Sequence, residues 1–157
     1  MAQFRGTVAR KEISLQTRDF GNVSISEEEI LHFPNGVFAF ENVHKFTVLH
    51  PLGEGVYPMW LQAVSNVHPC FVVFDPQKLV SGYSLELTAN EYALIGAQPG
   101  DALSCLVMAV VHDDYRQTTV NLKSPVVINP MKRLAAQFIL PQAYPVRYTI
   151  YGQGRGE

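Results

Sequence analysis

Chemistry-bearing side chains gather most densely at residues 112–116, where His-Asp-Asp-Tyr-Arg follows an apolar run. An imidazole beside two carboxylates could bind a divalent metal or transfer protons as a general acid or base. Adjacent strand residues point to opposite faces, so His112 and Asp113 cannot readily share one ion. We therefore expect a polar hairpin tip here. The alternative is a small metal- or ligand-dependent β-barrel enzyme that uses His112, Asp113 and Asp114.

The cysteines offer a second possible chemistry. His68 stands two residues before Cys70, a spacing that suits a thiol–imidazole pair on one strand face. Pro69 breaks that strand, and Cys105 lies within an apolar run typical of an inert core thiol. The chain holds no glycine-rich phosphate loop and no nucleophile elbow. These residues predict no catalytic site, no cofactor and no metal.

Composition and charge exclude several classes of partner. The 157 residues suffice for one domain that buries about two thirds of its unfolded surface. Twelve Lys and Arg residues against 14 Asp and Glu residues argue against nucleic-acid or membrane-surface binding. No signal-peptide pattern opens the sequence, and its longest apolar run, 106–111, is far shorter than a membrane span. We expect a cytoplasmic protein with one domain over residues 1–151 and a frayed tail at 152–157.

Short strands separated by turns dominate the pattern. In residues 118–129, Val120 and Leu122 alternate with polar residues, Pro125 interrupts the ladder, and an apolar triplet at 126–128 is typical of a strand buried on both faces. About ten such strands recur, with one short helix at 88–96 that Asn90 could cap. The chain is therefore predicted to be all-β and mainly antiparallel.

Residues 130–140 fit two structures. Asn129 as N-cap with Pro130 at the first helical position predicts a helix. The alternation of apolar residues predicts a strand instead, through Leu134, Ala136, Phe138 and Leu140. Residue types alone leave both open.

A turn at 34–42 carries two phenylalanines. Gly36 supplies a position where a positive φ costs little. Because aromatic side chains are usually buried, the first interpretation of Phe38 and Phe40 is as core residues. The second is as apolar anchors for a partner.

Four stretches occur in a definite order: Ile-Leu-His-Phe-Pro-Asn-Gly-Val-Phe-Ala-Phe-Glu at 30–41, Trp-Leu-Gln at 60–62, Phe-Val-Val-Phe-Asp-Pro at 71–76 and Thr-Val-Asn-Leu-Lys-Ser-Pro-Val-Val-Ile-Asn at 119–129. Gln137, and Tyr144 with Arg147, continue the pattern. The ordered set resembles the FliW family of bacterial flagellar assembly factors. The chain departs from it at Phe38-Ala39, where the family's turn usually has a second Pro-Gly.

The resemblance implies a non-enzymatic cytoplasmic protein with a small β-barrel-like or split-barrel fold and one short helix, and it favours a strand over residues 132–140. It also implies two partners. One is flagellin, held at its terminal regions before export. The other is CsrA, a dimeric RNA-binding repressor of translation that the family antagonises allosterically, in competition with flagellin.

Contact residues are predicted among exposed polar positions of the shared stretches and the two phenylalanines: Glu41, Asn121, Lys123, Asn129, Phe38 and Phe40. Each also has a structural interpretation, since Asn129 could cap a turn and Asn121 could bond across strands. A third class of function is a structural β domain that oligomerises through an edge strand.

Overall fold

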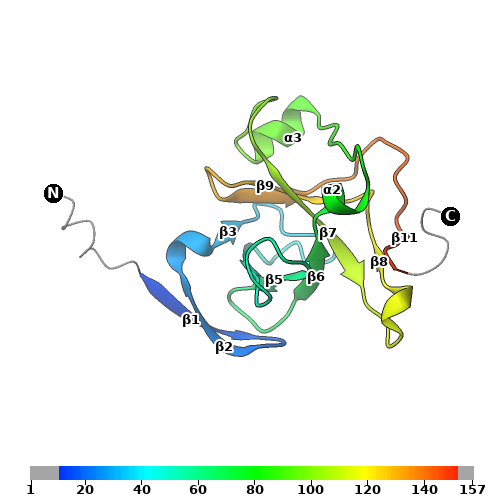
Figure 1. Cartoon of the computed structure of the whole chain (residues 1–157). Coiled ribbons are helices and arrows are strands. Elements are labelled where there is room, and N and C mark those ends of the chain that lie inside the picture. The colour runs from blue at the N-terminus through cyan, green and yellow to red at the C-terminus, as the bar shows by residue number, and fades with distance from the viewer. Residues whose placement is uncertain (1–10, 152–157) are drawn as a thin grey trace.

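The computed structural model describes residues 11–151, so the predicted tail at 152–157 lies outside the described residues (Figure 1). Within this range the chain forms eleven short strands. In chain order they are β1 Glu12–Thr17, β2 Gly21–Ser26, β3 Leu31–His32, β4 Lys45–Leu49, β5 Met59–Ala63, β6 Cys70–Phe74, β7 Ser104–Val110, β8 Thr119–Val120, β9 Val126–Asn129, β10 Leu134–Gln137 and β11 Tyr148–Thr149.

Seven of these strands close into a barrel in the order β7-β6-β5-β4-β3-β10-β9, because β9 also pairs with β7. Only the β3–β10 pair is parallel within the described residues, with Leu134 opposite His32. β7 belongs to two ladders: its first half pairs with β9, and its last residues, Ala109 and Val110, pair with β8. The predicted all-β, mainly antiparallel barrel is confirmed.

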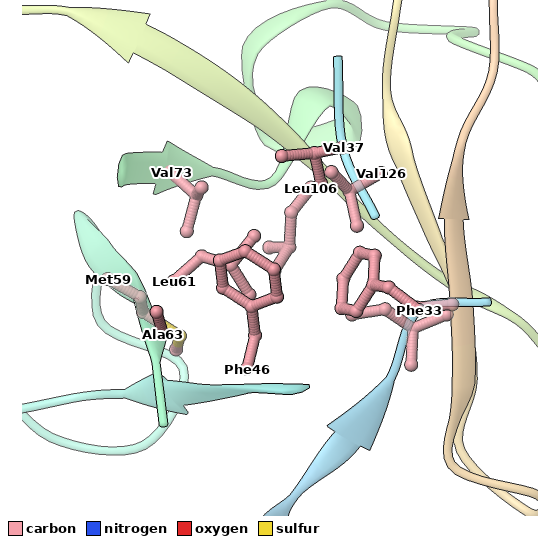
Figure 2. Close-up of a cluster of buried hydrophobic side chains, with 11 residues drawn as sticks. Phe33, Val37, Phe46, Met59, Leu61, Ala63, Val73, Leu106 and Val126 are labelled. Atoms are coloured by element: carbon pink, nitrogen blue, oxygen red, sulfur yellow. The ribbon is translucent and has the colours of Figure 1, made fainter. Parts of the chain in front are cut away.

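The barrel interior is filled by side chains from its strands and from the loop after β3 (Figure 2). Phe33 and Phe46 are fully buried, and their ring centroids lie 4.9 Å apart in an edge-to-face arrangement. The same buried cluster contains Leu61 of β5, Val73 of β6 and Val126 of β9. The barrel therefore encloses a packed core, and any functional surface lies at its ends or on its outside.

The β1–β2 hairpin lies apart from the barrel (Figure 1) and is fastened to it by Gln62 of β5. The Gln62 side chain is fully buried; its Oε1 accepts the backbone N–H of Arg18 at 3.0 Å, and its Nε2 donates to the Val67 carbonyl at 2.8 Å. A buried amide is costly unless hydrogen-bonded. Gln62 is thus a structural clamp.

Helical structure is short, but more frequent than expected. Two α-helices, α2 Pro76–Leu79 and α3 Ala89–Leu94, and two 3₁₀ turns, Glu27–Glu29 and Tyr115–Gln117, occur in the described residues. The prediction of one short helix was therefore wrong. Thr88, rather than Asn90, caps α3 through a capping box with Glu91. Asp75 likewise caps α2, through a hydrogen bond that its carboxylate accepts from the Gln77 N–H.

The barrel resolves the ambiguous region at 130–140. Residues 134–137 form β10, as the resemblance implied and the helix interpretation did not. The apolar triplet after Pro125 forms β9, all of whose residues are buried. The strand before Pro125 is shorter than its alternation suggests: β8 ends at Val120, and a turn capped by the Asn121 side chain follows.

Candidate functional site

One end of the barrel is crossed by the segment that joins β3 to β4, residues 34–42, here called the aromatic loop. Its position is fixed by Val37, which is buried in the barrel core, and by Phe38, whose backbone N–H reaches β10. Figure 2 shows Val37 among the core side chains. The same barrel end holds the first residues of β6 and the last residues of β7, because those strands are antiparallel neighbours.

The aromatic loop is built from tight turns. The Phe40 N–H donates to the Val37 carbonyl at 2.8 Å, and Ala39 between them has φ +73°. This is a type II turn, whose third residue is normally glycine. Ala39 adopts the left-handed backbone that this position requires, at a cost of about 1 kcal/mol. The Glu41 carboxylate accepts the Ala39 N–H at 3.1 Å and supports the turn.

Both phenylalanines of this loop are exposed, so their first interpretation as core residues was wrong. Phe38 keeps 45% of its surface accessible and Phe40 keeps 39%. Phe40 packs edge-to-face on Phe71 of β6, with ring centroids 5.8 Å apart, and Phe71 in turn lies against the buried ring of Phe46. An exposed aromatic side chain is thus supported by the core.

Gln137 connects the loop to the turn before β9. Its Oε1 accepts the Phe38 N–H at 2.9 Å, and its Nε2 donates to the Ser124 carbonyl at 3.1 Å. Gln137 belongs to the family resemblance but is not among the predicted contact residues. Its position as a polar residue at the end of an apolar strand was the signal for it.

Asn121 and Lys123 lie in the turn that Gln137 reaches, but their polar atoms are used internally. Asn121 Oδ1 accepts the N–H groups of Lys123 and Ser124, so it caps its own turn and does not bond across strands. Lys123 Nζ donates to the Gln142 carbonyl at 2.7 Å. Both side chains are half-buried. Their hydrogen bonds stabilise the turn at this end of the barrel.

Asn129 lies at the opposite end of β9 and is 4% exposed. Its side-chain amide donates to the carbonyls of Ile95 and Gly96, at 2.9 and 3.2 Å, where α3 ends. It therefore ties α3 to the barrel, and it does not cap a turn. The structure does not bring Asn129 together with the aromatic loop.

Replacement of Asn129 by alanine is expected to lower the free energy of unfolding by about 1–2 kcal/mol, because two carbonyls at the end of α3 lose their donor. Chemical denaturation measures this loss. Asn90→Ala on exposed α3 is the matched control, expected within ~0.5 kcal/mol of the parent. Equal midpoints for the two variants would contradict the structural role of Asn129.

The polar cluster at 112–114 does not form a metal site. Within residues 11–151, no group of three His, Cys, Asp or Glu side chains is placed to hold a metal ion. Asp114 caps the 3₁₀ turn Tyr115–Gln117 and pairs with Arg116, with Oδ1 and Nε 3.0 Å apart. The cluster forms the tip between β7 and β8, and the enzyme alternative gains no support.

The thiols are protected by their surroundings. Burial raises the pKa of Cys70 to about 11 and that of Cys105 to about 12. The thiolate is the reactive form, so neither group is a nucleophile at neutral pH. Both cysteines are unpaired.

The aromatic loop is therefore the candidate site. It is an apolar contact surface whose backbone is fixed by Gln137, Glu41 and the buried Val37. Val110 and Val111, where β7 ends at this side of the barrel, are also more than half exposed. Exposed aromatic and branched side chains at one place indicate a protein-contact surface. Among residues 11–151, no helix combines the length and apolar character needed to cross a membrane.

Comparison with known proteins agrees with this architecture. Residues 14–150 match the FliW protein family. The flagellar assembly factor FliW of Caldicellulosiruptor bescii is 35% identical, covering 92% of this chain and 93% of the relative. That of Moorella thermoacetica is 34% identical, covering 88% and 89%.

A solved structure gives the same result at the level of the fold. The crystal structure of the flagellar assembly factor FliW superposes with a TM-score of 0.82 at 26% identity, covering 90% of this chain and 99% of the other. The sequence match and the fold match therefore agree, and this chain belongs to the FliW family of flagellar assembly factors.

Proposed function

We propose that this chain is a non-enzymatic regulator that acts in the cytoplasm and binds two proteins, flagellin and the translational repressor CsrA. Binding of CsrA prevents it from binding RNA, and free flagellin displaces CsrA from the chain. Translation of flagellin is thereby coupled to the amount of flagellin awaiting export.

The aromatic loop is the observation that supports a binding role. Phe38 and Phe40 are exposed, yet the backbone beneath them is fixed by Gln137, Glu41 and the buried Val37. A surface that is ordered before binding loses little conformational entropy when a partner docks. Aromatic anchors of this kind carry much of the affinity at protein interfaces.

The charge of the chain suits antagonism without RNA contact. With a formal charge of −2, the protein has no excess of cations to attract phosphate. Docked beside a basic RNA-binding surface, its carboxylates would repel RNA over about 8 Å at physiological salt. Such antagonism requires only that the chain bind the RNA-free form of CsrA more tightly than the RNA-bound form.

The test is a calorimetric titration of the full chain into the CsrA dimer of the same organism, repeated with flagellin present. We expect saturable binding that flagellin abolishes, and loss of CsrA–RNA binding when the chain is added. Absence of heat and of co-elution with either protein would contradict the proposed partners while leaving family membership intact.

A further inference from the structure

The end of the barrel opposite the aromatic loop contains a pocket of about 350 Å³. It is formed where β4, β6 and β9 finish and where β5 and β7 begin. Its apolar part comes from the barrel strands, including Met59 and Leu106, and its polar part comes from Tyr57, Asp75, Gln77 and Ser104.

Asp75 is the only carboxylate among the residues that line this pocket, and none of them is Lys, Arg or His. It begins α2 as the N-cap, with Oδ1 accepting the Gln77 N–H at 2.9 Å. One hydrogen bond leaves a carboxylate with further acceptor positions. The local charge of the pocket is therefore negative.

Two weak acids beside Asp75 respond to its charge. Burial foremost, and then the negative charge of Asp75, raises the pKa of Tyr57 and the pKa of Cys105. Both groups stay protonated at neutral pH. No second anion forms in the pocket, and no cation of the lining balances Asp75.

We propose that this pocket binds a small organic ammonium ion, a primary amine that carries a short apolar chain. The ammonium group pairs with the Asp75 carboxylate and donates to the Ser104 hydroxyl, and the chain lies on Met59 and Leu106. Its volume lies at the low end of the range for small-molecule sites, which limits the ligand to a few carbon atoms.

Other ligand classes fit less well. An anion would be repelled by Asp75. A neutral apolar molecule would take water from the carboxylate without replacing it, and burial of an unpaired charge is costly. A cation with an apolar tail satisfies both halves of the lining. The site is remote from the aromatic loop, so its test does not depend on the binding role proposed for that loop.

The test titrates the full chain with n-butylammonium, and with n-butanol and butyrate as neutral and anionic analogues of the same length. We expect saturable binding of the amine alone. Amide chemical shifts in NMR spectra should change at Ser104 and Leu106 and stay constant at Phe38. Failure of the amine to bind, or equal binding of butyrate, would overturn the proposal.

Two variants tie binding to Asp75. Asp75→Asn keeps the helix cap, since Asn and Asp cap equally well, but removes the charge; we expect at least tenfold weaker amine binding. Gln77→Lys, at an exposed position, places a competing cation beside the carboxylate and should weaken binding similarly. Asp114→Asn, another N-cap outside the pocket, is the matched control and should leave it unchanged. Unchanged affinity in Asp75→Asn and Gln77→Lys would refute the site.

Discussion

Replacement of Gly36 by alanine is expected to destabilise the protein by about 3 kcal/mol or more and to displace the aromatic loop. Gly36 has φ +64°, a left-handed conformation that alanine adopts only at a cost. A Cβ atom there would also overlap the Phe40 carbonyl oxygen and lie 2.7 Å from the Glu41 Cα. These are backbone atoms, so the loop itself must move. Chemical denaturation measures the loss.

Gly55→Ala separates the two causes. Gly55 has a similar φ of +73°, but a Cβ there meets nothing within 4 Å. We expect this variant to lose only about 1 kcal/mol, the cost of the left-handed backbone. A loss as small as this in Gly36→Ala would mean that the loop does not pack closely on itself.

The barrel was predictable because its strands obey local rules. The triplet 126–128 is apolar on both faces and is buried, and Pro125 ends the ladder where a missing N–H requires it. The helix caps were less predictable, since Thr88 and Asn90 are both good N-caps on sequence grounds. Glu91, three residues after Thr88, completes a capping box and so selects Thr88. Tertiary packing decided instead that residues 134–137 pair with β9 and β3.

The site was only partly predictable, because composition does not say which apolar residue of a run faces the core. In the sequence Val37-Phe38-Ala39-Phe40, the valine side chain is buried in the barrel core and the two phenylalanine rings are exposed to solvent. The turn geometry sets this outcome. A positive φ at Ala39 reverses the chain after Val37, and strand alternation no longer applies.

The exposure expected for two polar residues also differs from the structure, in which Asn129 is buried and Lys123 is half-buried. Asn129 and Lys123 were expected at the surface because their side chains are polar. Each donates to backbone carbonyls outside the strands: Lys123 to that of Gln142, and Asn129 to those of Ile95 and Gly96. Buried carbonyls need donors, and long-range donors are invisible in a single sequence. Gln137 belongs to the same class, and its two hydrogen bonds join segments far apart in the chain.

Replacement of Phe40 by alanine is expected to weaken binding of CsrA and of flagellin by about 30-fold, or ~2 kcal/mol, the usual loss at an aromatic hot spot. Phe38→Ala should act in the same direction. Both partners should be affected because a shared surface is the simplest physical basis for the proposed competition. Calorimetric titration with each partner separately measures the two losses.

Phe20→Ala is the matched control. Phe20 is 36% exposed, close to the 39% of Phe40, and each ring has one edge-to-face partner: Trp60 at 4.9 Å and Phe71 at 5.8 Å. Phe20 instead lines an apolar groove of about 310 Å³ beside the β1–β2 hairpin. Loss of affinity in Phe40→Ala with full affinity in Phe20→Ala assigns binding to the aromatic loop. The reverse result would move the partner surface to the groove, since the two variants remove the same ring from equally exposed positions.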